Sequence, residues 1–333
     1  MKDYILKRLL LMIPTLFGIT LITFLVIQLA PGSPVESRMS LDQGIKSDQV
    51  TKEIVEQTKK LYGLDKPVHQ RYFIWLGQIV TLDFGNSYKD HRPVIDKIAE
   101  RLPITLILNA LSIFLVYLLA IPIGAWSAVR QWSFAERATT FVLFLLYSIP
   151  SFWMAVVLIY FFGGGGAFDI FPIYGVHSRG YEDLPFLERT LDFLWHLVLP
   201  VFCLTYASLA SLSRYQKGSL LEVLREDYIR TARAKGLAPN RVLFKHALRN
   251  SLIPIVTIIA SILPAMIGGS VIIETIFSIP GIGRLGFESV LSRDYPVIMA
   301  VATISAFLTL IGILISDLTY AVVDPRIGFE RKS

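Results

Sequence analysis

Six stretches of the chain are apolar for about 20 residues or more, and they constrain its fold more than any other feature of the sequence. Because a hydrocarbon layer roughly 30 Å thick is crossed by about 20 helical residues, each stretch predicts a transmembrane helix. Only 17% of the 333 residues are charged, which argues against a disordered chain or an ordinary soluble protein. We therefore predict an all-α integral membrane protein with six transmembrane helices, at residues 9–30, 104–129, 139–162, 193–212, 251–274 and 297–321.

The positions of the basic residues predict the orientation of these spans. With an even number of spans, both termini lie on the same side of the membrane. If that side is the cytoplasm, the inside segments carry 17 Lys and Arg against 7 acidic residues, as the positive-inside rule requires. The long outside segment 31–103 has 11 basic and 10 acidic residues. The net charge of +6 therefore indicates orientation in membrane lipid and not an affinity for nucleic acid.

The predicted spans divide the chain into three parts. Residues 1–30 hold the N-terminal cytoplasmic residues and the first span, and residues 104–333 form a five-helix transmembrane core. Between them, residues 31–103 form an extracytoplasmic segment with apolar residues at helical spacing in 47–62 and 72–79. Such a small helical segment has a thin core, so we expect it to lean on the membrane surface or on neighbouring chains.

The cytoplasmic loop 213–250 is polar but strongly patterned. Ser219 and Glu222 have the spacing of a capping box, which predicts that a helix begins there. Gly236 suits the left-handed conformation that ends a helix, and Pro239 suits the first turn of the next one. We therefore predict a short helix, a sharp turn and a second helix that leads into the fifth span, with the first helix and its turn within 219–239.

One face of this predicted helix is apolar and its flanks are basic. Every fourth residue is apolar or small, and Lys and Arg side chains stand on either side. This pattern suits a socket in a partner protein, and it equally suits an amphipathic helix lying on anionic lipid. The apolar positions are Leu220, Leu224, Tyr228 and Ala232, and the basic ones are Arg225, Arg230, Arg233 and Lys235.

Two runs of the loop, 230–237 and 246–254, resemble the cytoplasmic coupling loop of ATP-binding-cassette (ABC) importer permeases, in particular the dipeptide and oligopeptide branch. The general motif of that family opens with an acidic residue and two alanines. Here Arg230 and Thr231 replace the acid and the first alanine, as is usual in the peptide branch. Further runs resemble the same family at 29–34, 62–67, 83–87, 149–152, 274–281, 293–296 and 324–326.

The resemblance implies a type I ABC importer permease fold in the bacterial cytoplasmic (inner) membrane. Such a permease forms half of a translocation pathway beside a second homologous permease subunit. It receives peptides from an extracytoplasmic solute-binding protein and is driven by two ABC ATPase subunits. These partners bind ATP and Mg, and this chain has no phosphate-binding Gly-x4-Gly-Lys-Ser/Thr run, so we expect neither a cofactor nor catalysis here. The residues implied in ATPase coupling are Leu224, Tyr228, Arg230, Thr231, Ala232, Arg233, Lys235 and Gly236.

The substrate is left open by the sequence. The segments 168–196 and 324–327 look most like the sub-branch that admits peptides and the peptide-nucleotide antibiotic microcin C. Dipeptides, oligopeptides, glutathione and nickel chelates are the other candidates. The alternative function is an ATP-independent secondary transporter of small polar solutes, which would require charged groups or broken helices at mid-depth in the membrane.

Two acidic residues stand near the ends of predicted spans and are candidates for pathway or gating roles. Glu274 lies near the outer end of the fifth span and Asp317 near the inner end of the sixth, so we expect water to reach both. For Glu274 the alternatives are gating or subunit contact and a structural hydrogen bond. The small residues Ser261, Gly268 and Gly269 suit close helix packing or pathway lining.

Two other patterns point to no site. Gly281, Gly283 and Gly286 match the dinucleotide-binding pattern, but they follow a predicted span and not a strand, which indicates an outside turn. The five histidines are never within four residues of one another, so no helical metal pair is predicted.

Overall fold

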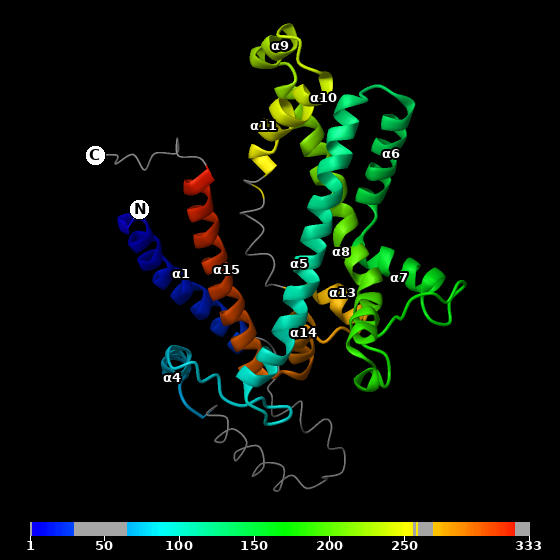
Figure 1. Ribbon diagram of the computed structural model, residues 1–333. Coiled ribbons are helices and arrows are strands. Elements are labelled where there is room, and N and C mark those ends of the chain that lie inside the picture. Colours follow the sequence, from blue (N-terminus) through cyan, green and yellow to red (C-terminus); the bar gives the residue numbers. More distant parts are fainter. Residues whose placement is uncertain (1, 30–64, 256–257, 259–268, 324–333) are drawn as a thin grey trace.

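The computed structural model of the chain describes residues 2–29, 65–255, 258 and 269–323. These residues are mostly helical, and the only β pairing among them is two isolated bridges, Asn86 with Pro93 and Gly163 with Phe171. Figure 1 shows long helices running between two ends of a bundle, with α9 at one end and α4 at the other, which we call the α9 end and the α4 end. The predicted all-α fold is confirmed for this part of the chain.

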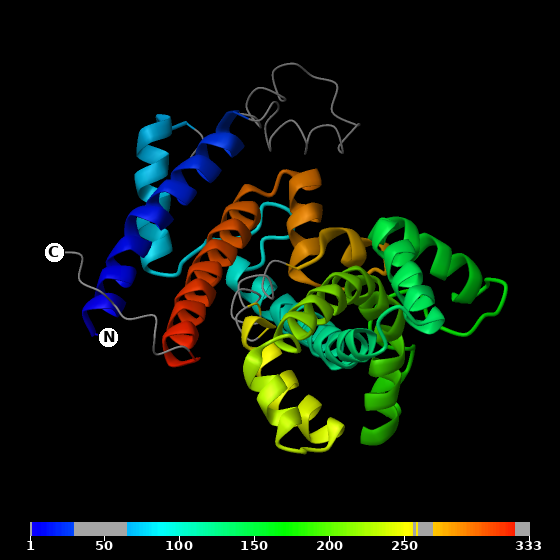
Figure 2. The same ribbon diagram turned by 90° about the horizontal axis from the view of Figure 1, so that it is seen from above.

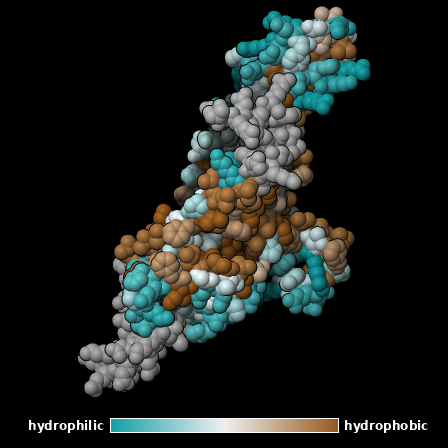
Figure 3. Space-filling model, turned by 90° about the vertical axis from the view of Figure 1, so that its left-hand side faces the viewer, coloured by the Kyte–Doolittle hydropathy of each residue, from teal (hydrophilic) through white to brown (hydrophobic). Residues whose placement is uncertain are grey.

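Among the described residues, four helices are long and apolar enough to cross a membrane. They correspond to four of the predicted spans, although two of them extend well beyond the predicted bounds. Many of their large apolar side chains are exposed in the isolated chain, as lipid-facing or subunit-facing helices require. Figure 3 shows these apolar side chains as a band between polar ends. The four helices are α1 (Lys2–Leu29), α5 (Val94–Val129), α8 (Phe186–Val223) and α15 (Tyr295–Val323).

The predicted third span, 139–162, is not one straight helix. α6 (Phe134–Ser148) and α7 (Ser151–Phe162) meet at an angle of 101°. Pro150 explains the break, because it has no N–H and disfavours helical geometry at Ile149 before it. The freed Ile149 carbonyl accepts a hydrogen bond of 2.5 Å from the Tyr206 hydroxyl. The described residues thus contain four candidate spans, or five if the bent pair counts as one, where six were predicted for the whole chain.

Half of the predicted fifth span, 251–274, lies outside the described residues. The structure describes its two ends, where α11 (Arg249–Ser251) and α13 (Val271–Ile276) lie. After α13 the chain continues into α14 (Ile282–Ser292), which ends at Arg293 in the left-handed conformation. The count of six spans therefore stays a prediction.

The centre of the bundle is the contact between α5 and α8. A Cβ atom on Gly124 of α5 would lie 2.5 Å from the carbonyl oxygen of Ser213 and 2.7 Å from the Cβ of Gln216, both on α8. The two backbones therefore approach as closely as only glycine permits. Nearer the α4 end, α13 and the residues after it close over the pair, in a core that includes Leu108, Leu197, Tyr206, Ile273 and Phe277.

Helix α1 lies beside α15 on the outside of the bundle (Figure 2). The start of α1 meets the end of α15, where Arg8 and Asp317 form an ion pair of 3.0 Å. Near the other end of α1, helix α4 (Val68–Val80) packs against Phe24 through Tyr72 and Trp75. The helix predicted from residues 72–79 is confirmed, and it leans on a membrane helix. The helix predicted at 47–62 lies outside the described residues.

The predicted coupling loop, 213–250, is largely helical, but its first helix begins elsewhere than predicted. α8 continues to Val223, so the prediction that a helix begins with a capping box at Ser219 is wrong. The Ser219 hydroxyl instead donates to the carbonyl of Ser251, 2.9 Å away, which satisfies it inside a helix. The separate helix is α9 (Asp227–Ala234). It is followed by α10 (Pro239–Arg241), the π-helix η2 (Val242–Leu248) and α11.

The predicted turn after the first helix is confirmed. Gly236 has a φ of 75°, and Pro239 is the first residue of α10. On the α4 side of the molecule, the connection between α7 and α8 is irregular, as its glycines and prolines indicate, apart from the short 3-10 helix η1 (Tyr181–Asp183).

Candidate functional site

Helix α9 is attached to the bundle by one buried face. Ile229 is fully buried and Ala232 is 7% exposed. The two side chains stand three residues apart, on one side of the helix. They pack against Leu220 of α8 and against Val242 and Ala247 of η2. Because α9 shares a core with the end of α8, a force applied to α9 reaches α8 directly.

The opposite face of α9 is polar and exposed. Arg230, Thr231, Arg233, Lys235 and Gly236 are all exposed. The ion pair of Arg230 with Asp227, at 3.2 Å, has side chains that are 73% and 93% exposed, so it contributes little to stability. This end of the molecule is the upper of the two polar ends in Figure 3. Basic side chains therefore outnumber acidic ones on the exposed face of α9.

The predicted apolar stripe is only partly correct. Leu220 and Leu224 lie at the end of α8, whereas Tyr228 and Ala232 belong to α9, so the four do not share one helix. Tyr228 is 42% exposed, and its hydroxyl accepts a hydrogen bond of 2.8 Å from the side-chain amide of Asn250.

The residue that the pattern missed is Ile229, which anchors α9. A helix starting at Asp227 places Ile229 and Ala232 on one face. The spacing of Ile229 and Ala232 is therefore visible in the sequence, but it indicates the buried face only if the helix is known to start at Asp227. Of the eight residues implied in coupling, Ala232 faces this chain's own core and Leu224 is half-buried, while the other six are exposed.

An open groove of about 480 Å³ separates the end of α8 from α9. Both acidic and basic side chains line it, so its electrostatic character is mixed. It adjoins the exposed face of α9 at Arg230 and extends that face toward α8. Its lining residues are Gly218, Leu221, Glu222, Arg225, Glu226, Asp227 and Arg230.

The last turns of α8 are tied to two further helices. The Gln216 amide donates to the Ser251 hydroxyl at 3.0 Å, beside the bond from Ser219 to the Ser251 carbonyl. On another side, Lys217 forms an ion pair of 2.6 Å with Glu136 of α6. Both Gln216 and Glu136 are buried. These contacts join α8 to α11 and α6, next to the attachment of α9.

Glu274 occupies a fully buried position between three helices. Its carboxylate accepts hydrogen bonds from the Thr105 hydroxyl of α5, at 3.2 Å, and from the backbone N–H of Arg284 of α14, at 2.8 Å. The Thr105 hydroxyl oxygen in turn accepts from the backbone N–H of Ile282, at 2.9 Å. Glu274 is 0% exposed, so the expectation that water reaches it is wrong for this chain by itself. The geometry matches the structural hydrogen-bond alternative.

The glycines around Glu274 explain the apparent dinucleotide pattern. A Cβ atom on Gly281 would overlap the Glu274 carboxylate, and one on Gly283 would lie 3.0 Å from its Oε2 atom. Gly269, with a φ of 63°, approaches the same carboxylate. These glycines therefore make room for a buried side chain.

Of the other pathway candidates that the structure describes, Gly269 approaches Glu274 and Asp317 does not. Asp317 pairs with Arg8 between α15 and α1. Ser261 and Gly268 lie outside the described residues. Among the candidates that the structure describes, Gly269 and Glu274 are in contact and Asp317 stands apart.

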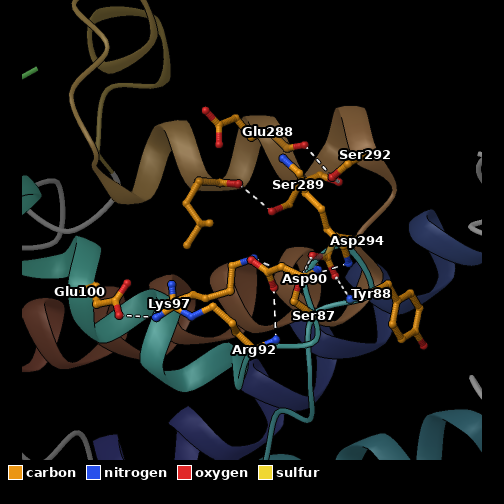
Figure 4. Close-up of polar contacts among 12 residues, drawn as sticks. Ser87, Tyr88, Asp90, Arg92, Lys97, Glu100, Glu288, Ser289, Ser292 and Asp294 are labelled. Carbon is orange, nitrogen blue, oxygen red and sulfur yellow. Dashed lines mark hydrogen bonds and ion pairs between the residues drawn. The ribbon is translucent and has the colours of Figure 1, made fainter. Parts of the chain in front are cut away.

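A second polar cluster lies at the α4 end and was not predicted (Figure 4). Asp294 is 1% exposed and accepts hydrogen bonds from the Ser87 hydroxyl and from the backbone N–H of Tyr88. Lys97 donates to Ser87 at 3.0 Å and forms an ion pair of 2.7 Å with Asp90. The sequence shows that the runs 83–87 and 293–296 resemble the same family. Nothing in a single sequence indicates that the two runs are in contact.

The charge of Asp90 is stabilised within this cluster. Burial opposes its charged form, but hydrogen bonds from Lys97, Ser87 and the backbone N–H of Arg92 outweigh burial and lower the pKa of Asp90 to about 2. Among the described residues, no group of three or more His, Cys, Asp or Glu side chains is placed to hold a metal ion.

A bundle of apolar helices that carries a surface helix on a shared core has the architecture of a helical membrane protein. Residues 120–329 match the family described as the binding-protein-dependent transport system inner membrane component. Residues 1–109 match the N-terminal membrane component of the same kind of system. The chain belongs to this family of inner-membrane permeases.

Characterised relatives match over nearly the whole chain. The chain is 44% identical to the oligopeptide transport system permease protein AppB of Bacillus subtilis, over 99% of this chain and 100% of the relative. It is 37% identical to the dipeptide transport system permease protein DppB of Lactococcus lactis, over 98% and 99%. It is 34% identical to the inner membrane ABC transporter permease protein YejB of Escherichia coli O157:H7, over 99% and 100%. These relatives favour an ABC permease over the secondary transporter.

Proposed function

We propose that this chain is the permease subunit of an ATP-driven peptide importer and forms half of its translocation pathway beside a second homologous subunit. The relatives named for oligopeptide and dipeptide transport support this assignment, because the match extends over the full length of each. Peptides are the substrate class that these relatives share. The microcin C sub-branch stays a prediction.

In this proposal the α9 end faces the cytoplasm, and the α4 end faces the solute-binding protein. The excess of Lys and Arg in the predicted inside segments supports this orientation. The start of α1 and the end of α15 also lie toward the α9 end (Figure 1), in agreement with termini on one side of the membrane.

The exposed face of α9 is the proposed contact with the two ABC ATPase subunits, which bind ATP and Mg. The observation that carries this proposal is the division of α9 into a face buried on α8 and η2 and a cationic face in solvent. Movement of the ATPases would displace α9, and the contacts of α8 with α6 and α11 would transmit that displacement into the bundle. The proposed contact residues are Tyr228, Arg230, Thr231, Arg233, Lys235 and Gly236.

Cross-linking in the assembled transporter tests this contact. Thr231→Cys places a thiol on the exposed face of α9, and the chain's single native cysteine, Cys203, is buried. We expect Thr231→Cys to form a disulfide with an engineered cysteine on an ATPase subunit. The matched control, Arg179→Cys, is exposed in the connection between α7 and α8 and should not cross-link. Equal cross-linking of the two variants would contradict the proposal.

Transport measurements test the same surface independently. Arg233→Glu reverses one exposed charge, and we expect it to lower ATP hydrolysis and peptide uptake about tenfold, as loss of one important interface contact does. Arg179→Glu, far from α9, should leave ATP hydrolysis measured without peptide and binding protein unchanged. Peptide uptake into vesicles that lack ATP would instead support the secondary transporter.

For Glu274 we propose a positioning role, in which its carboxylate holds α13 and α14 against α5. The gating alternative predicts that Glu274→Gln changes uptake and basal ATP hydrolysis without changing the unfolding temperature. A positioning role predicts that the unfolding temperature falls as well, because an amide cannot accept at both ends.

A further inference from the structure

A cavity of about 470 Å³ opens at the α4 end, where α1, α4, the segment 84–91 and the start of α15 meet. Its size is in the range of small-molecule sites. In Figure 2, α1 and α4 lie at one side of the molecule, and α15 separates them from the central pair of α5 and α8. The cavity therefore lies away from the α5–α8 pair, beside the smaller core that α1 and α4 share.

The charged side chains that line the cavity, Lys66 and Arg71, are both basic, and a histidine stands beside them. Lys66, Arg71 and His91 contribute to its wall, and no acidic residue is among the described residues that do. Arg71, on α4, is half-buried, and burial lowers the pKa of its guanidinium, because desolvation disfavours a cation. No described carboxylate lies within ion-pair distance of Arg71. An anionic ligand would supply the opposite charge.

Much of the remaining wall is aromatic or apolar, although Gln28, Gln78, Asn86 and Ser87 also line it, and it adjoins exposed apolar side chains at the end of α1. Trp75, Tyr88 and Tyr295 line the cavity together with Phe24 near the end of α1. Tryptophan and tyrosine are enriched where a membrane meets water. Next to Phe24, the large side chains of Leu25, Val26 and Leu29 point outward and are exposed. A ligand seated here has a basic wall for its polar part and an apolar rim for a hydrocarbon chain.

We propose that this cavity binds an anionic phospholipid, with the phosphate held by Arg71 and Lys66 and the acyl chains lying along the end of α1. A guanidinium suits a phosphate because it presents several N–H donors in one plane. A transported peptide could offer a carboxylate to the same bases. The apolar rim on the outermost helix favours the lipid, since a peptide carboxylate needs no such surface.

The test is native mass spectrometry of the full-length chain in detergent, titrated with phosphatidylglycerol or phosphatidylcholine of identical acyl chains. We expect phosphatidylglycerol to be retained about tenfold more strongly, as for a charge-assisted contact. Arg71→Gln should lower its retention to the level of phosphatidylcholine, and Arg71→Lys should give an intermediate value. Arg179→Gln removes one exposed positive charge elsewhere and should have no effect.

Three results would overturn the proposal. One is equal retention of the two lipids, and another is equal behaviour of Arg71→Gln and Arg179→Gln. The third is Arg71-dependent binding of inorganic phosphate, or of a tripeptide, as tight as that of phosphatidylglycerol, since the hydrocarbon chain would then contribute nothing. If Arg71→Gln fails to fold, Lys66→Gln replaces it, because Lys66 is exposed, and we expect about a threefold loss of retention. No loss in that variant would likewise count against the lipid.

Discussion

The buried carboxylate of Asp294 accepts a hydrogen bond from the hydroxyl of Ser87, a residue 207 positions earlier in the chain. Its other oxygen accepts from the backbone N–H of Tyr88 at 2.8 Å. These bonds fasten the segment before α5 to the segment before α15. Two helices that are distant in sequence are thereby held in one arrangement at the α4 end.

Replacing Asp294 is expected to destabilise the chain strongly. Asp294→Ala leaves the Ser87 hydroxyl and the Tyr88 N–H without their acceptor in a buried site, at a cost of about 2–4 kcal/mol. Thermal unfolding of the purified protein measures the loss. Asp183→Ala removes an exposed carboxylate and should change the unfolding temperature little, so similar values for the two variants would refute the assignment.

The ion pair of Lys217 with Glu136 predicts a non-additive pair of mutations. Lys217→Met removes one of the two described side chains that donate to the buried Glu136 carboxylate. The Thr140 hydroxyl, at 2.7 Å, then is the one that stays among the described residues. We expect this single change to cost about 2–4 kcal/mol, because it leaves an unpaired buried charge. Adding Glu136→Gln should recover part of the loss. A double mutant whose loss equals the sum of the two single losses would show that the pair is not coupled.

The close approach of α5 and α8 predicts that Gly124 tolerates no larger side chain. Gly124→Val would force the backbone of α5 away from Ser213 and Gln216 and should cost about 1–3 kcal/mol. Gly77→Val is the matched control, because a Cβ atom on Gly77 meets nothing within 4 Å. Unfolding temperatures of the two variants in the same detergent provide the comparison.

The lowered pKa of Asp90 predicts how its contribution depends on pH. Its pKa is about 2, below the ordinary value of 3.8, so its charged form stabilises the folded chain. That stabilisation is complete above the unfolded value and is lost as the pH falls through about 2. Asp90→Asn should therefore lower the unfolding temperature near neutral pH, with the deficit shrinking between about pH 4 and pH 2. Asp65→Asn controls for the loss of one negative charge, and a deficit that is constant with pH would contradict the prediction.

How far the sequence predicts the fold differs from one element to the next. The spans that became α1, α5, α8 and α15 were predictable because twenty apolar residues in water are unfavourable whatever surrounds them. The bend between α6 and α7 carried a visible signal in Pro150, but apolarity alone indicates a single span. Hydropathy indicates whether a segment is long and apolar enough to cross a membrane, but it does not indicate whether the segment bends.

At the candidate coupling site, the local chemistry was predictable and the helix start was not. Gly236 and Pro239 act within their own turn, so the sequence predicts them correctly. Ser219 has the spacing of a cap, but its hydroxyl finds an acceptor on Ser251 of another helix, and α8 continues through it. Ile229, which anchors α9, could be identified only after the structure showed that α9 starts at Asp227.

By itself, the sequence determined that the chain enters a membrane and which turn ends α9, because these depend on composition and on bonds between near neighbours. The tertiary structure decided the partners of Glu274, Asp294 and Lys217. Each of these side chains meets a group that is distant along the chain, and such a meeting is set by helix packing and not by local spacing.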